Sequence, residues 1–159
     1  MYNLGVNPAK LDTAEDWHGG YFAWGETKSK DRFTWENYKY GNAKTSLTKY
    51  CTRKNCGFRN FKDGKVALEL EDDAAYVNLG KCWNIPSARD MVELDENTTS
   101  EWVDNYNDIE NLCGRTYTSK INGNHIFLPF TGYMECSNVI ISDSWKDGRY
   151  WLLEMDVSE

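Results

Sequence analysis

Residues 82–94, CWNIPSARDMVEL, bring together an indole ring, a proline and an apolar helical face. Pro86 disfavours a helical backbone at Ile85, so we expect the chain to be extended there, just before the predicted helix. Ser87 stands three residues before Asp90, a variant of the capping box that opens many helices. The stretch therefore predicts a helix over residues 88–96.

The predicted helix has one apolar face, because apolar residues recur along it at helical spacing. We expect the ring of Trp83, just before the helix, to lie in the core and to fix this corner of the fold. Removal of a core indole costs about 3 to 5 kcal/mol, which is the cost that we predict for Trp83→Ala. The apolar face consists of Ala88, Met91, Val92 and Leu94.

Three further segments have local signals for secondary structure. Glycines frame the aromatic run at 21–24, which predicts a short buried strand. Residues 68–80 predict a short helix, with Asp72 and Asp73 favourable in its first turn and a glycine at its end. Residues 98–106, TTSEWVDNY, predict a strand.

The clearest local signal is a hairpin in residues 116–130, TYTSKINGNHIFLPF. Two β-prone runs flank Asn122 and Gly123, and this dipeptide accepts the positive φ angles of a tight turn. Pro129 cannot donate to a ladder, so it ends or edges the second strand. We expect short, irregular strand-containing segments after it.

The local signals and the composition together predict an α+β fold, with short antiparallel strands, about two short helices and long ordered loops. The chain has 159 residues, which suits one domain, and 14% of them are aromatic, including seven tryptophans. A core of large rings favours strands and loops over a helix bundle. No run approaches the ~20 apolar residues that span a bilayer, and residues 1–10 lack the pattern of a signal peptide. We expect a soluble chain with no membrane span.

Positive charge is concentrated in one part of an acidic chain. The formal net charge is −7, yet residues 28–59 contain nine basic and two acidic residues, a net of +7. Aromatic residues are interleaved with these cations, as in a platform for single-stranded nucleic acid and as in a solvated loop over an aromatic core. The sequence pI near 4.9 favours the loop and argues against nucleic acid as a partner. An anionic glycan is an alternative partner for this segment.

The five cysteines are an odd number and lack the spacing of zinc knuckles. Cys51 and Cys56 could close a small disulfide loop in an oxidising compartment. We favour reduced, partly buried thiols, because free cysteine is often a small core residue. The remaining three are Cys82, Cys113 and Cys136.

Motifs for catalysis, metal binding and cofactor binding are absent from the sequence. His18 and His125, the two histidines, have no cysteine or aspartate at ligand spacing. The acidic run at 69–73 could supply oxygens to Ca²⁺, yet its spacing is not that of a calcium loop, so we favour helix capping. Two of the many carboxylates could act in glycoside hydrolysis, but the sequence does not place any pair. We predict no catalytic residue, no metal and no cofactor, and keep an enzyme of unknown type as an alternative.

Five motifs follow one another along the chain: GGYFAWGET (19–27), LTKYC (47–51), LELEDDAAYVNLGKCWNIPSARDMVEL (68–94), NGNHIFLPFTGY (122–133) and GRYW (148–151). As a set they resemble the Fibrobacter succinogenes major paralogous domain family of Bacteroidetes. That family is related to the C-type-lectin-like and formylglycine-generating-enzyme folds. The resemblance covers most of the chain and implies a single C-type-lectin-like domain over residues 1–159.

The chain departs from the family pattern in its motifs and in its length. Where the family reads W-R-[ML]-P-T, Asn84 replaces the arginine and Ser87 replaces the threonine, which keeps the cap and removes a charge. The family's further strands after GRYW do not follow before Glu159, which implies an open strand edge and favours a homo-oligomer or a larger assembly. The C-terminal cysteine pair of the catalytic relatives and the calcium motifs of C-type lectins are also absent.

The resemblance and the aromatic residues together indicate a non-catalytic binding or adhesion module. We expect loops at 28–60 and 133–151 to meet a glycan or a protein, at a cell surface, outside the cell or on a virion. The alternative is a structural or receptor-binding component of a surface or phage virion assembly. Rings near loop ends stack on sugars or anchor proteins, and core packing is the competing interpretation. The candidate ligand-binding residues are Trp35, Tyr38, Tyr40, Trp145, Tyr150 and Trp151.

Overall fold

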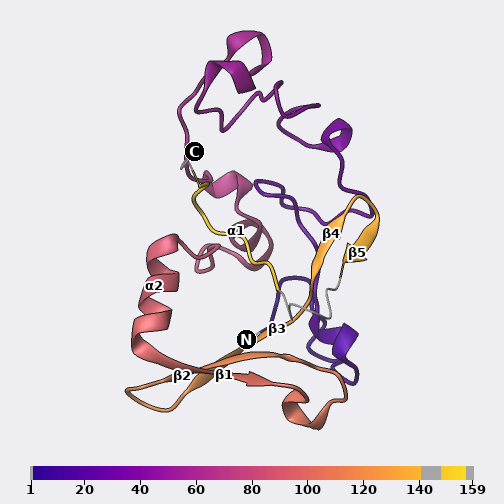
Figure 1. The fold of residues 1–159 in the computed structure, drawn as a ribbon, viewed down its shortest axis with the longest axis vertical. Coiled ribbons are helices and arrows are strands. Elements are labelled where there is room, and N and C mark those ends of the chain that lie inside the picture. The colour runs from indigo at the N-terminus through magenta and orange to yellow at the C-terminus, as the bar shows by residue number, and fades with distance from the viewer. Residues whose placement is uncertain (1, 141–147, 157–159) are drawn as a thin grey trace. The chain divides into compact units, whose positions relative to one another are not determined.

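The computed structural model describes residues 2–140 and 148–156, and Figure 1 shows its ribbon. The backbone divides into two compact units, which we describe separately. The first unit holds the described residues of 1–21, 89–134 and 138–150, and the second holds those of 22–88, 135–137 and 151–159.

A three-stranded antiparallel sheet, ordered β1-β2-β3, forms the frame of the first unit. Its strands are β1 (Thr98–Val103), β2 (Gly114–Ser119) and β3 (His125–Pro129). The predicted strand at 98–106 is confirmed over Thr98–Val103. The predicted hairpin is confirmed, because β2 pairs with β3, although residues 120–124 connect the strands and only Gly123 of the Asn122-Gly123 pair has a positive φ. Gly123 has a φ of 72° there, a conformation that glycine adopts without a steric penalty.

Aromatic packing forms the core of the first unit. Trp17, Leu112 and Phe127 are its buried centre. The rings of Tyr106 and Phe127 are stacked with their centroids 3.9 Å apart, and Trp17 meets both of them edge to face. These contacts join the start of the chain to the sheet through rings, as the aromatic composition predicts.

The predicted helix after Pro86 is confirmed as α2 (Ala88–Asn97). Its apolar face is only half covered: Met91 and Leu94 are partly buried, whereas Val92 is 56% exposed. No residue of α2 is fully buried. The described residues also form a two-stranded sheet, β4 (Tyr133–Glu135) and β5 (Asn138–Ile140). Short 3-10 helices lie at Ala14–Trp17, Trp35–Asn37, Lys54–Cys56, Phe58–Asn60, Leu70–Asp72 and Tyr106–Asp108.

The second unit consists mainly of ordered loops around a second aromatic core. Tyr40, Tyr50 and Leu68 are buried at its centre. Its helix α1 (Ala74–Leu79) begins where the carboxylate of Asp73 accepts a hydrogen bond from the amide of Tyr76 and ends at Gly80. The predicted capping role of Asp73 is therefore confirmed, although the helix is shorter than residues 68–80.

Two expectations are wrong. Residues 21–24 form no strand, because the chain turns at Trp24 and Gly25, where the amide of Glu26 donates to the carbonyl of Ala23. The indole of Trp24 donates to the carbonyl of Leu152. Trp83 is not a core residue, since 42% of its surface is exposed. The corner is fixed instead by backbone groups: the amide of Ile85 donates to Asp73, and the carbonyl of Pro86 accepts from Leu153.

With two α-helices and a three-stranded antiparallel sheet in the described residues, the fold is compatible with the α+β class. Within the same residues, no helix has the length and apolar character needed to cross a membrane. This agrees with the expected lack of a membrane span in that part of the chain.

Candidate functional site

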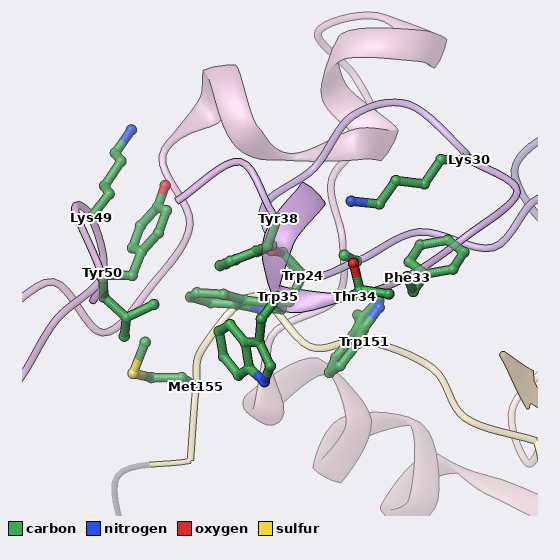
Figure 2. Close-up of a pocket in the computed structure, with 12 residues that line it drawn as sticks. Trp24, Lys30, Phe33, Thr34, Trp35, Tyr38, Lys49, Tyr50, Trp151 and Met155 are labelled. Atoms are coloured by element: carbon green, nitrogen blue, oxygen red, sulfur yellow. The ribbon is translucent and has the colours of Figure 1, made fainter. Parts of the chain in front are cut away.

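An open pocket of about 370 Å³ lies within the second unit (Figure 2). Most of its wall is aromatic or aliphatic, and it is built from three segments that are distant in the sequence: 23–38, 47–50 and 151–155. No carboxylate, histidine or cysteine side chain of the described residues lines it. The lining residues are Ala23, Trp24, Lys30, Phe33, Thr34, Trp35, Tyr38, Leu47, Lys49, Tyr50, Trp151 and Met155.

Two indoles of the pocket are exposed to solvent. Trp35 is 46% exposed and Trp151 is 53% exposed. The Trp151 ring is held in place because its Nε1 donates to the carbonyl of Phe22 over 2.7 Å. The Trp35 ring meets Tyr38 edge to face, with centroids 5.7 Å apart. Such rings offer broad faces to a ligand at little cost in conformational entropy.

The ring hydroxyl and indole groups deeper in the pocket are already hydrogen-bonded. Trp24 donates to Leu152, Tyr38 donates to the carbonyl of Trp24, and the hydroxyl of Tyr50 donates to Asp72. Burial and the bond to Asp72 raise the pKa of Tyr50 to about 12, so this hydroxyl stays protonated at neutral pH. The floor of the pocket is therefore well fixed and offers rings rather than spare donors.

The two lysines of the pocket are also committed. Lys30 Nζ contacts both carboxylate oxygens of Glu26 and the carbonyl of Asn37 within 2.9 Å. Lys49 Nζ contacts one oxygen each of Glu69, Glu71 and Asp72 within 3.1 Å. An ammonium group has three donors, so neither lysine has a donor left for a ligand.

Asp72 is the buried charge on which this region is organised. It has no exposed surface and accepts hydrogen bonds from Lys39, Lys49, Tyr40 and Tyr50. Burial alone would raise its pKa, but the hydrogen bonds from the two lysines and the two hydroxyls hold the pKa well below its usual value. Asp72 lies in the first turn of a helix as predicted, although this is the 3-10 helix Leu70–Asp72 and not α1, and it is also the centre of an ion-pair network.

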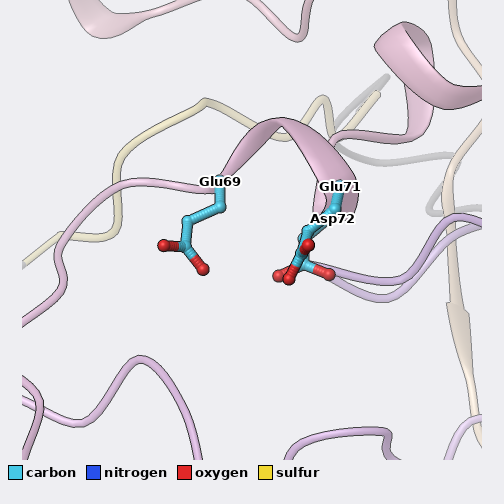
Figure 3. Close-up of side chains that lie close together, drawn as sticks. All are labelled: Glu69, Glu71 and Asp72. Atoms are coloured by element: carbon cyan, nitrogen blue, oxygen red, sulfur yellow. The ribbon is translucent and has the colours of Figure 1, made fainter.

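The acidic run contains a cluster that a metal ion could use, formed by Glu69, Glu71 and Asp72 (Figure 3). Their ligand oxygens lie within 4.8 Å of one another. The ammonium of Lys49 contacts all three carboxylates and neutralises part of their charge. The cluster is thus an ion-pair network in which a lysine stands where a cation would bind.

The predicted ligand-binding residues are distributed over several places. Trp35, Tyr38 and Trp151 line the pocket together. Tyr40 is a core residue behind it, only 9% exposed. Tyr150 belongs to the first unit, where its hydroxyl donates to the carbonyl of Pro129 and burial raises its pKa to about 12. Trp145 lies outside the described residues.

Several pocket residues were missed by sequence reasoning. Trp24 lies in the run that predicted a strand, and Phe33, Lys49 and Met155 had no signal that separated them from core or surface positions. The LTKYC motif contains two pocket residues, Lys49 and Tyr50. Both side chains are held by hydrogen bonds to Asp72, and the spacing of the motif does not predict this partner.

The histidines and the cysteines lie elsewhere. His125 Nε2 is 3.1 Å from the hydroxyl of Tyr106, and His18 is partly buried, which lowers its pKa. Cys51 and Cys56 are both free thiols, so the structure contains no disulfide loop between them. Cys51 is buried, and its Sγ contacts the carbonyls of Arg53 and Phe61.

Comparison of the chain with protein-family models, curated proteins and solved structures found no match.

Proposed function

We propose that this protein is a non-catalytic binding module whose aromatic pocket holds part of a glycan. The observation that carries the proposal is the pair of half-exposed indoles, Trp35 and Trp151, beside an open pocket with a fixed aromatic floor. The volume of about 370 Å³ is within the range of small-ligand sites. A sugar ring fits the chemistry, because its C–H faces stack on indoles while its outer hydroxyls stay in water.

The committed polar groups decide how such a ligand would be held. With Lys30 and Lys49 occupied by carboxylates, stacking is the main interaction that the wall offers. Within the described residues, the indole nitrogen of Trp35 has no partner, so it is a donor for one hydroxyl of the ligand. We expect weak binding by one pocket and useful binding when several copies act together.

The non-catalytic assignment is supported by the state of the ionisable groups. Lys49 contacts all three carboxylates of the acidic cluster beside the pocket and neutralises part of their charge, and Glu26 is paired with Lys30. A general acid or base needs a group with a proton to exchange near neutral pH. Burial would raise the pKa of Asp72, but hydrogen bonds from Lys49 and other donors lower it, and a hydrogen bond from Lys49 lowers the pKa of Glu69. These two carboxylates therefore stay charged at neutral pH.

We also propose that the chain belongs to the Fibrobacter succinogenes major paralogous domain family and has a single C-type-lectin-like domain. The support is the order and spacing of the five motifs between Gly19 and Trp151. A cell-surface, extracellular or virion location follows from that proposal, and an open strand edge would serve a homo-oligomer or a larger assembly. Light scattering on the purified chain tests the assembly, which a monodisperse monomer would contradict.

A glycan screen with three matched variants tests the pocket. Immobilised glycans would be probed with the native chain and with Trp35→Ala, Trp151→Ala and Trp83→Ala. Trp83 is also an exposed indole of the second unit but does not line the pocket. Loss of a stacking anchor should weaken binding at least about tenfold for the first two variants, and Trp83→Ala should bind as the native chain does.

The proposal fails if no glycan binds or if all three variants bind alike. Binding of a peptide or protein ligand that depends on Trp35 and Trp151, with no glycan bound, would support the protein-binding alternative instead. A hydrolysed glycan recovered from the screen would contradict the non-catalytic assignment.

A further inference from the structure

The segment from Cys51 to Gly64 forms a loop whose two ends are fastened together. The amides of Asp63 and Gly64 both donate to the carbonyl of Cys51 over 3.1 Å. The carboxylate of Asp63 accepts from the amides of Tyr50 and Cys51 at the same place. Loops of this kind, with closed ends and their own internal turns, often carry function. We call residues 51–64 the closed loop.

The closed loop is strongly basic. Residues 51–62 contain four basic residues and no acidic residue. All four side chains are exposed. Within the part of the chain that the structure describes, none of the four forms an ion pair with a carboxylate. They are Arg53, Lys54, Arg59 and Lys62.

Three other cations of the basic segment differ from these four, because Lys30, Lys39 and Lys49 are each paired with a carboxylate of the second unit. Lys28, Arg32 and Lys44 are also exposed and without an ion pair in the described residues, but they lie outside the closed loop. The one carboxylate at the closed loop, that of Asp63, is turned toward the backbone. Burial would raise its pKa, but hydrogen bonds from Cys51 and other amides lower it, so the carboxylate is satisfied without a cation.

Aromatic rings are exposed among these cations. Phe58 is 50% exposed and Phe61 is 38% exposed. The guanidinium of Arg59 lies 5.0 Å from the centroid of the Phe58 ring, which helps to hold it in place. Exposed rings beside cations that form no ion pair in the described residues offer a partner both apolar and charged contacts.

The closed loop is joined to the aromatic pocket by Leu47. The amide of Leu47 donates to the carbonyl of Cys56 over 2.9 Å, and the amide of Phe58 donates to the carbonyl of Leu47 over 2.8 Å. The side chain of Leu47 lines the pocket. The closed loop and the wall of the pocket therefore adjoin at Leu47.

We propose that the closed loop binds an anionic polysaccharide, with Arg53, Lys54, Arg59 and Lys62 contacting its carboxylate or sulfate groups and Phe58 and Phe61 contacting its ring faces. The site follows from the loop itself. It rests on the proposed function only in the choice of a polysaccharide over another polyanion. The net charge of −7 of the whole chain opposes any polyanion, so the choice of a polysaccharide over nucleic acid rests on the neighbouring pocket proposed for a glycan.

The test uses two triple variants of the full chain with the same change in charge. Arg53→Gln/Lys54→Gln/Arg59→Gln removes cations of the closed loop. Lys28→Gln/Arg32→Gln/Lys81→Gln removes exposed cations of the second unit that lie outside the closed loop and form no ion pair in the described residues. Binding to dextran sulfate, polygalacturonate, neutral dextran and single-stranded poly-dT would be measured over a range of salt concentrations.

We expect the native chain and the control variant to bind dextran sulfate or polygalacturonate with an affinity that falls with salt. The loop variant should bind at least about tenfold more weakly, and its slope of log affinity against log salt should be smaller by about one for each cation removed. Binding to one polymer alone would separate sulfate from carboxylate recognition.

Three results would overturn the inference: equal losses in both triple variants, no binding of either anionic polysaccharide, or tighter binding of poly-dT than of both. The pocket proposal fails separately. If Trp35→Ala and Trp151→Ala leave neutral glycan binding unchanged while the loop variant loses dextran sulfate binding, then the closed loop is a binding site and the pocket is not.

Discussion

The ammonium group of Lys49 lies 2.6 Å from a carboxylate oxygen of Asp72, which has no exposed surface. Lys49 also lines the aromatic pocket. One ion pair thus links the buried charge of the second unit to the wall of its candidate site. Breaking a buried pair by removal of one partner is costly, because the other charge stays behind without compensation.

Asp72→Asn should destabilise the protein strongly. The amide can accept from fewer of the four donors and leaves Lys39 and Lys49 without their buried counter-charge. We expect the free energy of unfolding to fall by about 3 to 5 kcal/mol, measured by urea denaturation. Asp95→Asn, on the exposed surface of α2, is the control and should change it by less than about 0.5 kcal/mol. Equal effects of the two substitutions would contradict the role of Asp72.

The contribution of Asp72 should depend on pH. Its pKa in the folded protein is lower than the ordinary value of 3.8, so the unfolded chain binds the proton more readily. The carboxylate therefore stabilises the fold fully above about pH 5, and this stabilisation is lost as pH falls below about 4. The difference in unfolding free energy between the native chain and Asp72→Asn should be constant from pH 7 to about 5 and shrink at pH 3. A difference that grows at low pH would show that the sign is wrong.

Trp17 and Trp83 should respond differently to the same substitution. Trp17 is 7% exposed and contacts three aromatic rings, whereas Trp83 is 42% exposed. We expect Trp17→Ala to cost about 3 to 5 kcal/mol and Trp83→Ala less than about 1 kcal/mol. Thermal or urea unfolding of both variants measures the loss of unfolding free energy. A loss in Trp83→Ala as large as that in Trp17→Ala would show that Trp83 is a core residue.

Gly57 should be intolerant of a side chain. A Cβ there would overlap the carbonyl oxygen of Phe61 and lie 3.1 Å from Cys51 Sγ. We expect Gly57→Ala to loosen the closed loop and to speed hydrogen exchange at the amides of Leu47 and Phe58. Gly64→Ala is the control, because a Cβ at Gly64 meets nothing within 4 Å, although its φ of 68° adds local strain. Slow exchange at both amides in Gly57→Ala would contradict this packing.

Local chemistry predicted the elements that depend on neighbours in the sequence. The hairpin followed from Asn122 and Gly123, the start of α2 from Pro86, and the cap of α1 from Asp73. Each of these features is decided within a few residues. The coarse α+β class followed from the same signals together with the aromatic composition.

Features that depend on distant partners could not be predicted in this way. An aromatic run between glycines predicts a strand at 21–24, but Trp24 satisfies its indole nitrogen 128 residues further along the chain, at Leu152. The sequence places Asp72 near a helix start but does not predict its ion-pair partners. These partners, Lys39 and Lys49, come from loops whose residues have no regular apolar period. Exposure of Trp83 also depends on what the rest of the fold leaves uncovered.

Part of the pocket wall comes from Trp151 and Met155, while Trp24 and Trp35 come from the early part of the sequence. The ribosome therefore releases Trp24 and Trp35 long before it makes Trp151 and Met155. Until residue 155 has emerged, the early rings lack these neighbours and can contact other chains. A nascent chain that ends before residue 151 lacks part of the wall, and we expect it to aggregate more readily than the full chain.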